Sequence, residues 1–145
     1  MVRKRAAAAA LALGLAATSA ATAQVPREAE GCYDLMVGLT RWGEAMTRAC
    51  RADSSMAETL RLHADAGERR FEELFGSAAL AAARQRLGQA LQRSVQGDPQ
   101  SCAQLGNRPP LTIDQQRDME AELARMVPDW SRFAFRPVPG AMACE

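Results

Sequence analysis

Apolar residues recur along most of the chain at alternating steps of three and four, which is the spacing of an amphipathic helix. Between Cys32 and Cys50 the pattern is unbroken and predicts one helix of about five turns. Three more stretches with this period follow, and no paired alternation marks β-strands. The pattern therefore predicts an all-α fold. The positions expected to face the core are Leu35, Met36, Leu39, Trp42, Met46, Met56, Leu60, His63, Gly67, Phe71, Leu74, Leu80, Ala83, Leu87, Leu91, Val95, Ile113, Met119, Leu123, Met126 and Val127.

Helix-boundary signals separate these stretches. Ser-x-x-Glu from Ser55 and Thr-x-x-Gln from Thr112 match the capping box, in which two side chains satisfy amide donors of the first turn. Gly76 suits the left-handed position after a helix, and Pro128 should end or bend the last helix. Because the connections are short, we expect an up-down four-helix bundle followed by an extended C-terminal tail.

The first 23 residues are typical of a secretory signal. A basic start, Met1–Arg5, precedes an uncharged Ala/Leu run, and small residues occupy the positions that a signal peptidase recognises before Gln24. We therefore expect a cleaved signal peptide over residues 1–23, a single helical domain over residues 24–145, and a periplasmic or secreted location. Arginine replaces lysine throughout the expected mature region, which favours a GC-rich bacterial genome.

Charge narrows the classes of partner. Three of the 18 basic residues lie in the leader, so the expected mature chain carries a net charge of −2. This balance argues against nucleic-acid binding. Ala6–Ala23 is only weakly apolar beside a spanning helix, and no later stretch is apolar enough, so we expect no stable membrane span after cleavage.

Four cysteines in an exported chain indicate two disulfides, for which three pairings exist. Cys32 and Cys50 lie about 27 Å apart along one expected helix, whereas a disulfide needs Cα atoms within roughly 7 Å. In an up-down bundle the end of the first helix meets the end of the third, which brings Cys50 to Cys102, and the tail can return Cys144 to Cys32. We therefore predict the pairs Cys50–Cys102 and Cys32–Cys144.

No motif for catalysis or nucleotide binding is present, and we expect no catalytic residue, metal site or cofactor. His63, the only histidine, falls on an apolar helix face without a neighbouring nucleophile or ligand set, so we favour a structural role. Methionine thioethers can bind Cu(I), but most of these methionines fall on apolar faces, where core packing is the better interpretation. They are Met36, Met46, Met56, Met119, Met126 and Met142.

One segment carries the residue types that anchor protein interfaces. The tail places Trp130, Phe133 and Phe135 between Arg132 and Arg136. The same aromatic residues are expected of a tail that crosses the bundle and seals its core, and we favour that role. The segment nevertheless remains the best candidate surface for a partner.

Arg86 and Arg93 extend this candidate surface. They share a face of the third helix, and no acidic residue occurs between Ser77 and Gly97. An anionic partner would complement this face. Pairing with a neighbouring helix or simple exposure to solvent would account for it as well, and we favour these two structural explanations over a partner.

We expect a non-catalytic exported protein that contacts an unknown protein or envelope component. An inhibitor, a chaperone-like factor or an accessory subunit would each fit, and this expectation rests on fold class and composition. The alternative is a carrier that binds an apolar small molecule between its helices, in a cavity lined by Trp42, Met46, His63 and Leu91. An enzyme is the least favoured class.

Overall fold

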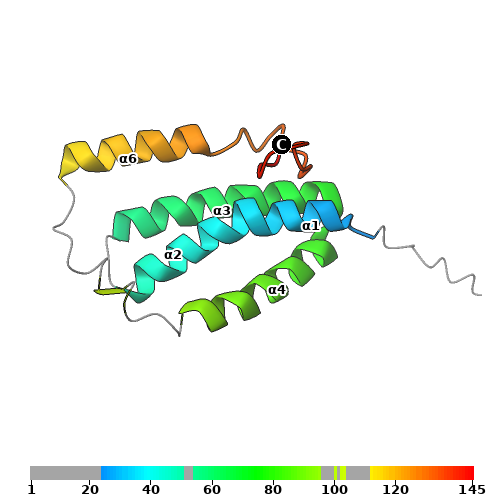
Figure 1. Cartoon of the computed structure of the whole chain (residues 1–145), viewed down its shortest axis with the longest axis horizontal. Coiled ribbons are helices and arrows are strands. Elements are labelled where there is room, and N and C mark those ends of the chain that lie inside the picture. Colours follow the sequence, from blue (N-terminus) through cyan, green and yellow to red (C-terminus); the bar gives the residue numbers. More distant parts are fainter. Residues whose placement is uncertain (1–23, 51–53, 96–99, 101, 104–111) are drawn as a thin grey trace, which may run out of the picture.

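The computed structural model describes residues 24–50, 54–95, 100, 102–103 and 112–145 and is mostly helical (Figure 1). The helices are α1 (Arg27–Tyr33), α2 (Leu39–Ala49), α3 (Ser54–Phe75), α4 (Ser77–Val95) and α6 (Ile113–Met126), and a π-helical turn, η1 (Asp34–Gly38), joins α1 to α2. In these ranges no strand forms, and no helix is long and apolar enough to cross a bilayer. The expected all-α class is confirmed. The expected signal peptide, residues 1–23, lies outside the described residues.

The helices α1, η1 and α2 follow one another without a break and form one rod (Figure 1). The regular sequence period predicts a single α-helix here, but η1 inserts one wider turn. A π-turn holds an extra residue and rotates the helix face that follows it. Val37 and Gly38 within this turn are buried, whereas Leu39 and Trp42, two expected core residues that follow it, are exposed.

Two of the expected helix-end signals are confirmed. Gly76, between α3 and α4, has a φ of 89°, which glycine adopts without strain, and its amide donates to the Glu72 carbonyl at 2.7 Å. At the start of α6 the Thr112 amide donates to Gln115 Oε1 at 2.9 Å. In return the Gln115 amide donates to Thr112 Oγ1 at 3.3 Å, which completes the capping box.

The hydrophobic core lies between the rod, α3, α4 and the segment that follows α6. Its largest fully buried side chains include Tyr33, Phe71 and Phe135. The ring centroids of Tyr33 and Phe71 are 4.7 Å apart, and those of Phe71 and Phe135 are 5.0 Å apart. From α4, Leu80 and Ala83 are buried in this core, as the sequence pattern predicts.

The buried face of α3 agrees with the expected one only in part, since Phe71 is buried as predicted. Ala57 and Ala64 are fully buried, whereas Leu60 and His63 are half-buried and Leu74 is exposed. A helix pattern drawn through the largest apolar side chains misses Ala57 and Ala64, because alanine gives only a weak apolar signal.

The helix α6 contributes no described side chain to the core. Ile113 and Met126 are 70% and 62% exposed, so their assignment to the core is wrong, and the side chains of Met119 and Leu123 lie outside the described ones. Figure 1 shows α6 and α4 on opposite sides of the rod and α3. The residues after α6, rather than α6 itself, cover the core.

Two disulfides connect distant parts of the chain. Cys32 pairs with Cys144 at a Cα–Cα distance of 5.8 Å, and Cys50 pairs with Cys102 at 4.9 Å. These are the pairs expected from the order and direction of the helices. The first bond fixes the C-terminal segment to the buried Cys32 of α1, and the second joins the end of α2 to the chain after α4.

Candidate functional site

After α6 the chain crosses the core. Phe133 and Phe135 are buried and Trp130 is half-buried, and the centroids of the three rings lie 4.8 to 6.0 Å apart. The carbonyl of Phe133 accepts a hydrogen bond of 3.0 Å from Arg70 Nε of α3. Phe135 has a φ of 55°, an uncommon conformation for a bulky residue, and its ring packs edge-on against Phe71. This segment therefore seals the core.

Gly67 of α3 allows this close packing. A Cβ atom at this position would lie 2.8 Å from Trp130 Cη2 and 2.8 Å from Val37 Cγ2. The missing side chain therefore lets both the indole ring and η1 approach the α3 backbone. The indole N–H of Trp130 is buried without a hydrogen-bond partner among the described residues, so this ring contributes through packing.

The aromatic residues that seal the core are not available on the candidate partner surface. Phe133 and Phe135 are 3% and 1% exposed, so they cannot anchor a partner and their assignment to that surface is wrong. The physical reason is that the core would otherwise be open on the side facing α6, and the three aromatic rings are the large apolar groups that cover it.

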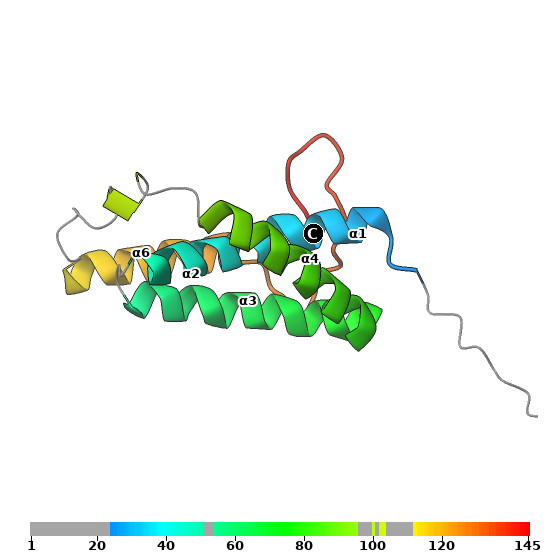
Figure 2. The same cartoon turned by 90° about the horizontal axis from the view of Figure 1, so that it is seen from below.

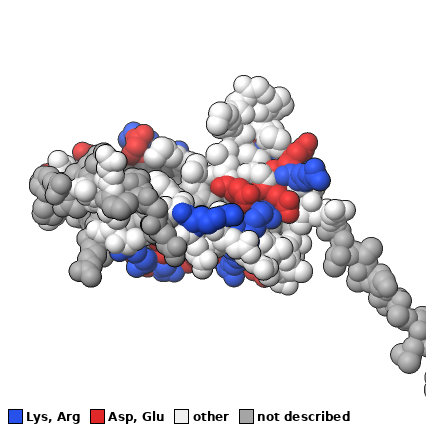
Figure 3. Space-filling model, turned by 60° about the horizontal axis from the view of Figure 1, so that its bottom comes forward, with Lys and Arg blue, Asp and Glu red and all other residues white. Residues whose placement is uncertain are grey.

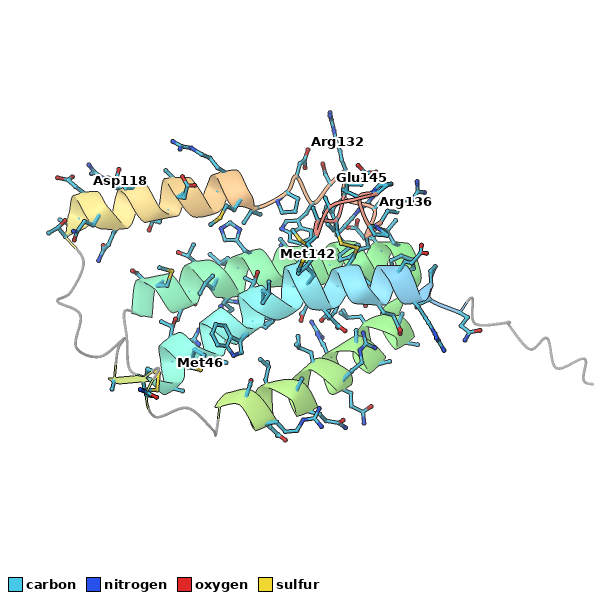
Figure 4. The ribbon with its side chains drawn as sticks, in the orientation of Figure 1. Met46, Asp118, Arg132, Arg136, Met142 and Glu145 are labelled. Atoms are coloured by element: carbon cyan, nitrogen blue, oxygen red, sulfur yellow. A yellow bond between two sulfur atoms is a disulfide. The ribbon has the colours of Figure 1, made fainter. Side chains whose placement is uncertain are left out.

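The arginines of the candidate surface have different surroundings. Arg86 contacts Glu30 at 3.3 Å and Asp34 at 3.2 Å, so it links α4 to the rod. The others are exposed: Arg93, Arg132 and Arg136. Figure 4 shows that Arg132 and Arg136 come from the C-terminal segment and point away from the helices.

The chain ends in a hairpin held by a single β-bridge, which we call the C-terminal hairpin (residues 136–145). Arg136 and Glu145 exchange two backbone hydrogen bonds of 2.9 Å each. The Val138 amide donates to the Ala143 carbonyl, also at 2.9 Å. Cys144 then fastens the returning strand to the core through its disulfide. Where an extended tail was expected, the chain folds back on itself.

A tight turn closes the C-terminal hairpin. Val138–Ala141 has the sequence Val-Pro-Gly-Ala, the Ala141 amide donates to the Val138 carbonyl at 3.2 Å, and Gly140 has a φ of 75°. These are the features of a type II turn, in which proline fixes the first central residue and glycine takes the left-handed second one. Met142, directly after the turn, is 95% exposed.

A buried ion-pair cluster lies between the rod, α3 and α4. Glu68 of α3 is 3% exposed, and its carboxylate accepts hydrogen bonds from Arg41 at 2.9 Å, from Arg84 at 2.6 Å and from the Tyr33 hydroxyl at 3.2 Å. Arg41 also donates to Asp65 at 2.6 Å. Two guanidinium groups therefore surround one buried carboxylate, and each comes from a different helix.

The charges of the cluster stabilise one another. Burial alone would raise the pKa of Glu68, but hydrogen bonds from Arg84 and Arg41 and their positive charges outweigh it, so this pKa is lowered. Burial opposes the charge of Arg41, yet hydrogen bonds to Glu68 and Asp65 raise its pKa. Burial and the neighbouring carboxylate raise the pKa of Tyr33. At neutral pH Glu68 is therefore ionised, both arginines are protonated and Tyr33 is neutral.

The cluster forms the floor of a shallow depression of about 290 Å³ that Leu87 and Leu91 of α4 also line. Figure 3 shows acidic and basic side chains lying side by side on one face of the molecule. Of the four residues expected to line a carrier cavity, only Leu91 reaches this depression, since Trp42 is exposed and Met46 is buried elsewhere. A second depression, of about 560 Å³ at the turn between α3 and α4, includes none of the four.

The cluster contains groups of the kind used in acid–base chemistry, but they are engaged with one another. Both carboxylate oxygens of Glu68 accept hydrogen bonds from the surrounding side chains. Within the described ranges, no group of three histidine, cysteine or acidic residues could hold a metal ion. His63 is half-buried and lines neither depression. The arrangement is suited to fixing how three helices pack.

Two features of this region are absent from the sequence-based predictions. Glu68 lies four residues after the buried Ala64 and three before the buried Phe71, so a carboxylate on a buried helix face was the available signal. Pro139-Gly140 is a strong turn signal, and it marks the tip of the C-terminal hairpin.

Comparison with protein-family models, with curated proteins and with solved structures finds no match for this chain. Inferences about its function therefore rest on its own fold and surface.

Proposed function

We propose that the protein is exported, loses residues 1–23 and acts without catalysis, through contact with another protein in the periplasm or outside the cell. The observation that carries this proposal is the mutual pairing of Glu68, Arg41, Arg84 and Tyr33. Paired ionisable groups of this kind occur in structural ion-pair networks as well as in active sites. Here both oxygens of Glu68 are occupied in joining the rod, α3 and α4, which favours the structural role.

Two further observations support the proposal. Both disulfides are of the kind that persists in an oxidising compartment, which agrees with the signal-like leader. The chain also reverses direction from the rod to α3, from α3 to α4 and from α4 to α6 (Figure 1), which supports an up-down arrangement with α6 as its peripheral member. An inhibitor, a chaperone-like factor or an accessory subunit would each fit such a scaffold.

The proposal is tested by isolating the oxidised mature protein from its native compartment after mild cross-linking. We expect one protein to co-purify in fixed proportion, and the complex to form again from the two purified components. An apolar small molecule recovered by solvent extraction, with no protein in fixed proportion, would contradict the proposal and favour a carrier.

A further inference from the structure

A shallow depression lies beside the residue at which we expect the mature chain to begin. It has a volume of about 560 Å³ and is lined by Gln24, Val25 and residues 75–79 of the turn between α3 and α4. Figure 1 and Figure 2 both show the start of α1 and this turn at the same end of the molecule. Val25 packs against the hydrophobic core, so the adjoining Gln24 is kept at the depression.

The surroundings of Gln24 do not suit a positive charge. Among the described residues that line the depression, none carries a charged side chain, so a protonated α-amine at Gln24 would meet no carboxylate there. The helix α4 also begins here at Ser77, and the Leu80 amide donates its first intrahelical bond to the Gly76 carbonyl at 3.2 Å. The start of a helix carries a partial positive charge, which disfavours an ammonium group nearby. An uncharged chain end suits this place better.

Glutamine at a free N-terminus can remove this charge by its own chemistry. The α-amine nitrogen attacks the side-chain amide carbon, Cδ, and a lactam ring closes as the bond from Cδ to the amide nitrogen breaks. The proton that the attacking amine gives up passes to the departing nitrogen, which leaves as ammonia. No oxidant or reductant is needed, and the product, pyroglutamate, is uncharged.

We propose that Gln24 of the exported chain is converted to pyroglutamate and that the lactam ring occupies the depression. The inference rests on the proposed function, because removal of residues 1–23 is what exposes the α-amine of Gln24. The amides in the first turn of α4 have no acceptor within the helix, so they can donate to the lactam carbonyl. Val25 and Phe75, both half-buried, supply apolar contacts for the ring.

This modification leaves the mature protein without a primary amine. Lys4 is the only lysine, and it lies within the expected signal peptide. Residues 24–145 therefore contain a single primary amine, the α-amine of Gln24, and cyclisation consumes it. The mature protein then resists aminopeptidases, which require a free α-amine, and does not react with amine-directed reagents.

The test combines intact mass with an amine-reactive label, the N-hydroxysuccinimide ester of biotin. The oxidised protein, isolated from its native compartment, should be lighter by one ammonia than a chain that begins with an open Gln24, and it should take up no biotin. Gln24→Asn is the matched control, because this side chain keeps the amide but is one carbon too short to close the ring. The variant should take up one biotin per chain.

A second measurement isolates the part played by the fold. Protease cleavage of a fusion protein exposes a fresh Gln24 on the folded chain, and cyclisation is followed by mass beside a synthetic peptide of residues 24–31. The folded protein should cyclise roughly threefold faster than the peptide, because the positive start of α4 favours the uncharged, reactive amine. Equal rates would overturn the assignment of the depression to this ring.

The outcomes of the labelling test separate this inference from the proposed function. An exported chain that begins at Gln24 and takes up biotin would overturn the inference and leave export standing. Cleavage at another bond, which would give the mature chain a different first residue, would do the same. A chain that retains Met1–Arg5 would contradict both the inference and the proposed export.

Discussion

Glu68 occupies a helix position at which the spacing of Ala64 and Phe71 leads one to expect an apolar side chain. A buried carboxylate is costly unless it is paired, and here two arginines and a tyrosine hydroxyl surround it. Such a cluster adds little net stability compared with apolar packing. It does disfavour other helix arrangements, because each of them would leave a charge buried without its partner.

Glu68→Gln should lower the free energy of unfolding by about 2 kcal/mol, because two guanidinium groups lose their shared counter-charge. Arg84 is partly exposed, which moderates the effect. Glu73→Gln is the matched control, since Glu73 is exposed and pairs with Arg70 at the surface, and it should have an effect of about 0.5 kcal/mol or less. Urea unfolding followed by helical circular dichroism measures both. Equal effects would show that Glu68 is no different from a surface carboxylate.

The contribution of Glu68 to the free energy of unfolding should also depend on pH. The pKa of Glu68 is lowered in the folded protein, so its contribution is complete above the ordinary carboxyl value of 4.5 and is lost as pH falls through the folded value. The difference in unfolding free energy between the wild type and Glu68→Gln should therefore shrink on acidification. Urea unfolding in buffers from neutral pH to about pH 3 tests this expectation. A constant difference would contradict it.

Gly67 shows how one position can control the packing of two segments. Gly67→Ala should lower stability by about 1–3 kcal/mol, because the added methyl group would lie closer to Trp130 and Val37 than van der Waals contact allows. Gly88→Ala is the control within α4, where nothing lies within 4 Å of the added carbon. That substitution should raise stability by about 0.5–1 kcal/mol through helix propensity. Thermal unfolding compares the two, and a stabilising Gly67→Ala would disprove the close contact.

At the scale of the elements, the sequence predicted the ends of helices better than it predicted which helix faces are buried. The turn at Gly76 and the capping box at Thr112 depend on neighbouring residues alone, so the sequence is sufficient to find them. The disulfide pairs depend on the order and direction of the helices. The π-turn η1 carries no such local signal, and the exposure of Leu39 and Trp42 after it was not predicted.

The remaining differences arise from tertiary competition. The pattern on α6 predicts a buried face, but Phe133 and Phe135 already cover the core, so Ile113 and Met126 remain exposed. The period of apolar residues identifies a helix face that is suitable for burial. It does not show whether that face or another apolar segment covers the core. The aromatic part of the candidate partner surface was ambiguous for a similar reason, because aromatic residues suit both a core and an interface. Phe133 and Phe135 take the core role that the sequence favoured.

The C-terminal segment should depend on its disulfide more than the helices do. In the Cys32→Ala/Cys144→Ala double variant we expect faster trypsin cleavage after Arg132, because the segment can then leave the core. The Cys50→Ala/Cys102→Ala variant loses a bond of similar entropic value, about 4 kcal/mol, yet keeps this segment fastened. Cleavage is timed by mass spectrometry under conditions in which both variants remain helical. Equal cleavage rates would contradict a specific tether.

At the scale of the whole molecule, the central claim is that an exported helical protein uses one disulfide to bind its C-terminal segment to the core. Intact mass and peptide mapping of the non-reduced protein, purified from its native compartment, test this claim most directly. The expected result is a chain that begins at Gln24, contains no free thiol and yields linked peptides for Cys32–Cys144 and Cys50–Cys102. A chain that retains its first residues, or a peptide that links Cys32 to Cys50 or to Cys102, would contradict it.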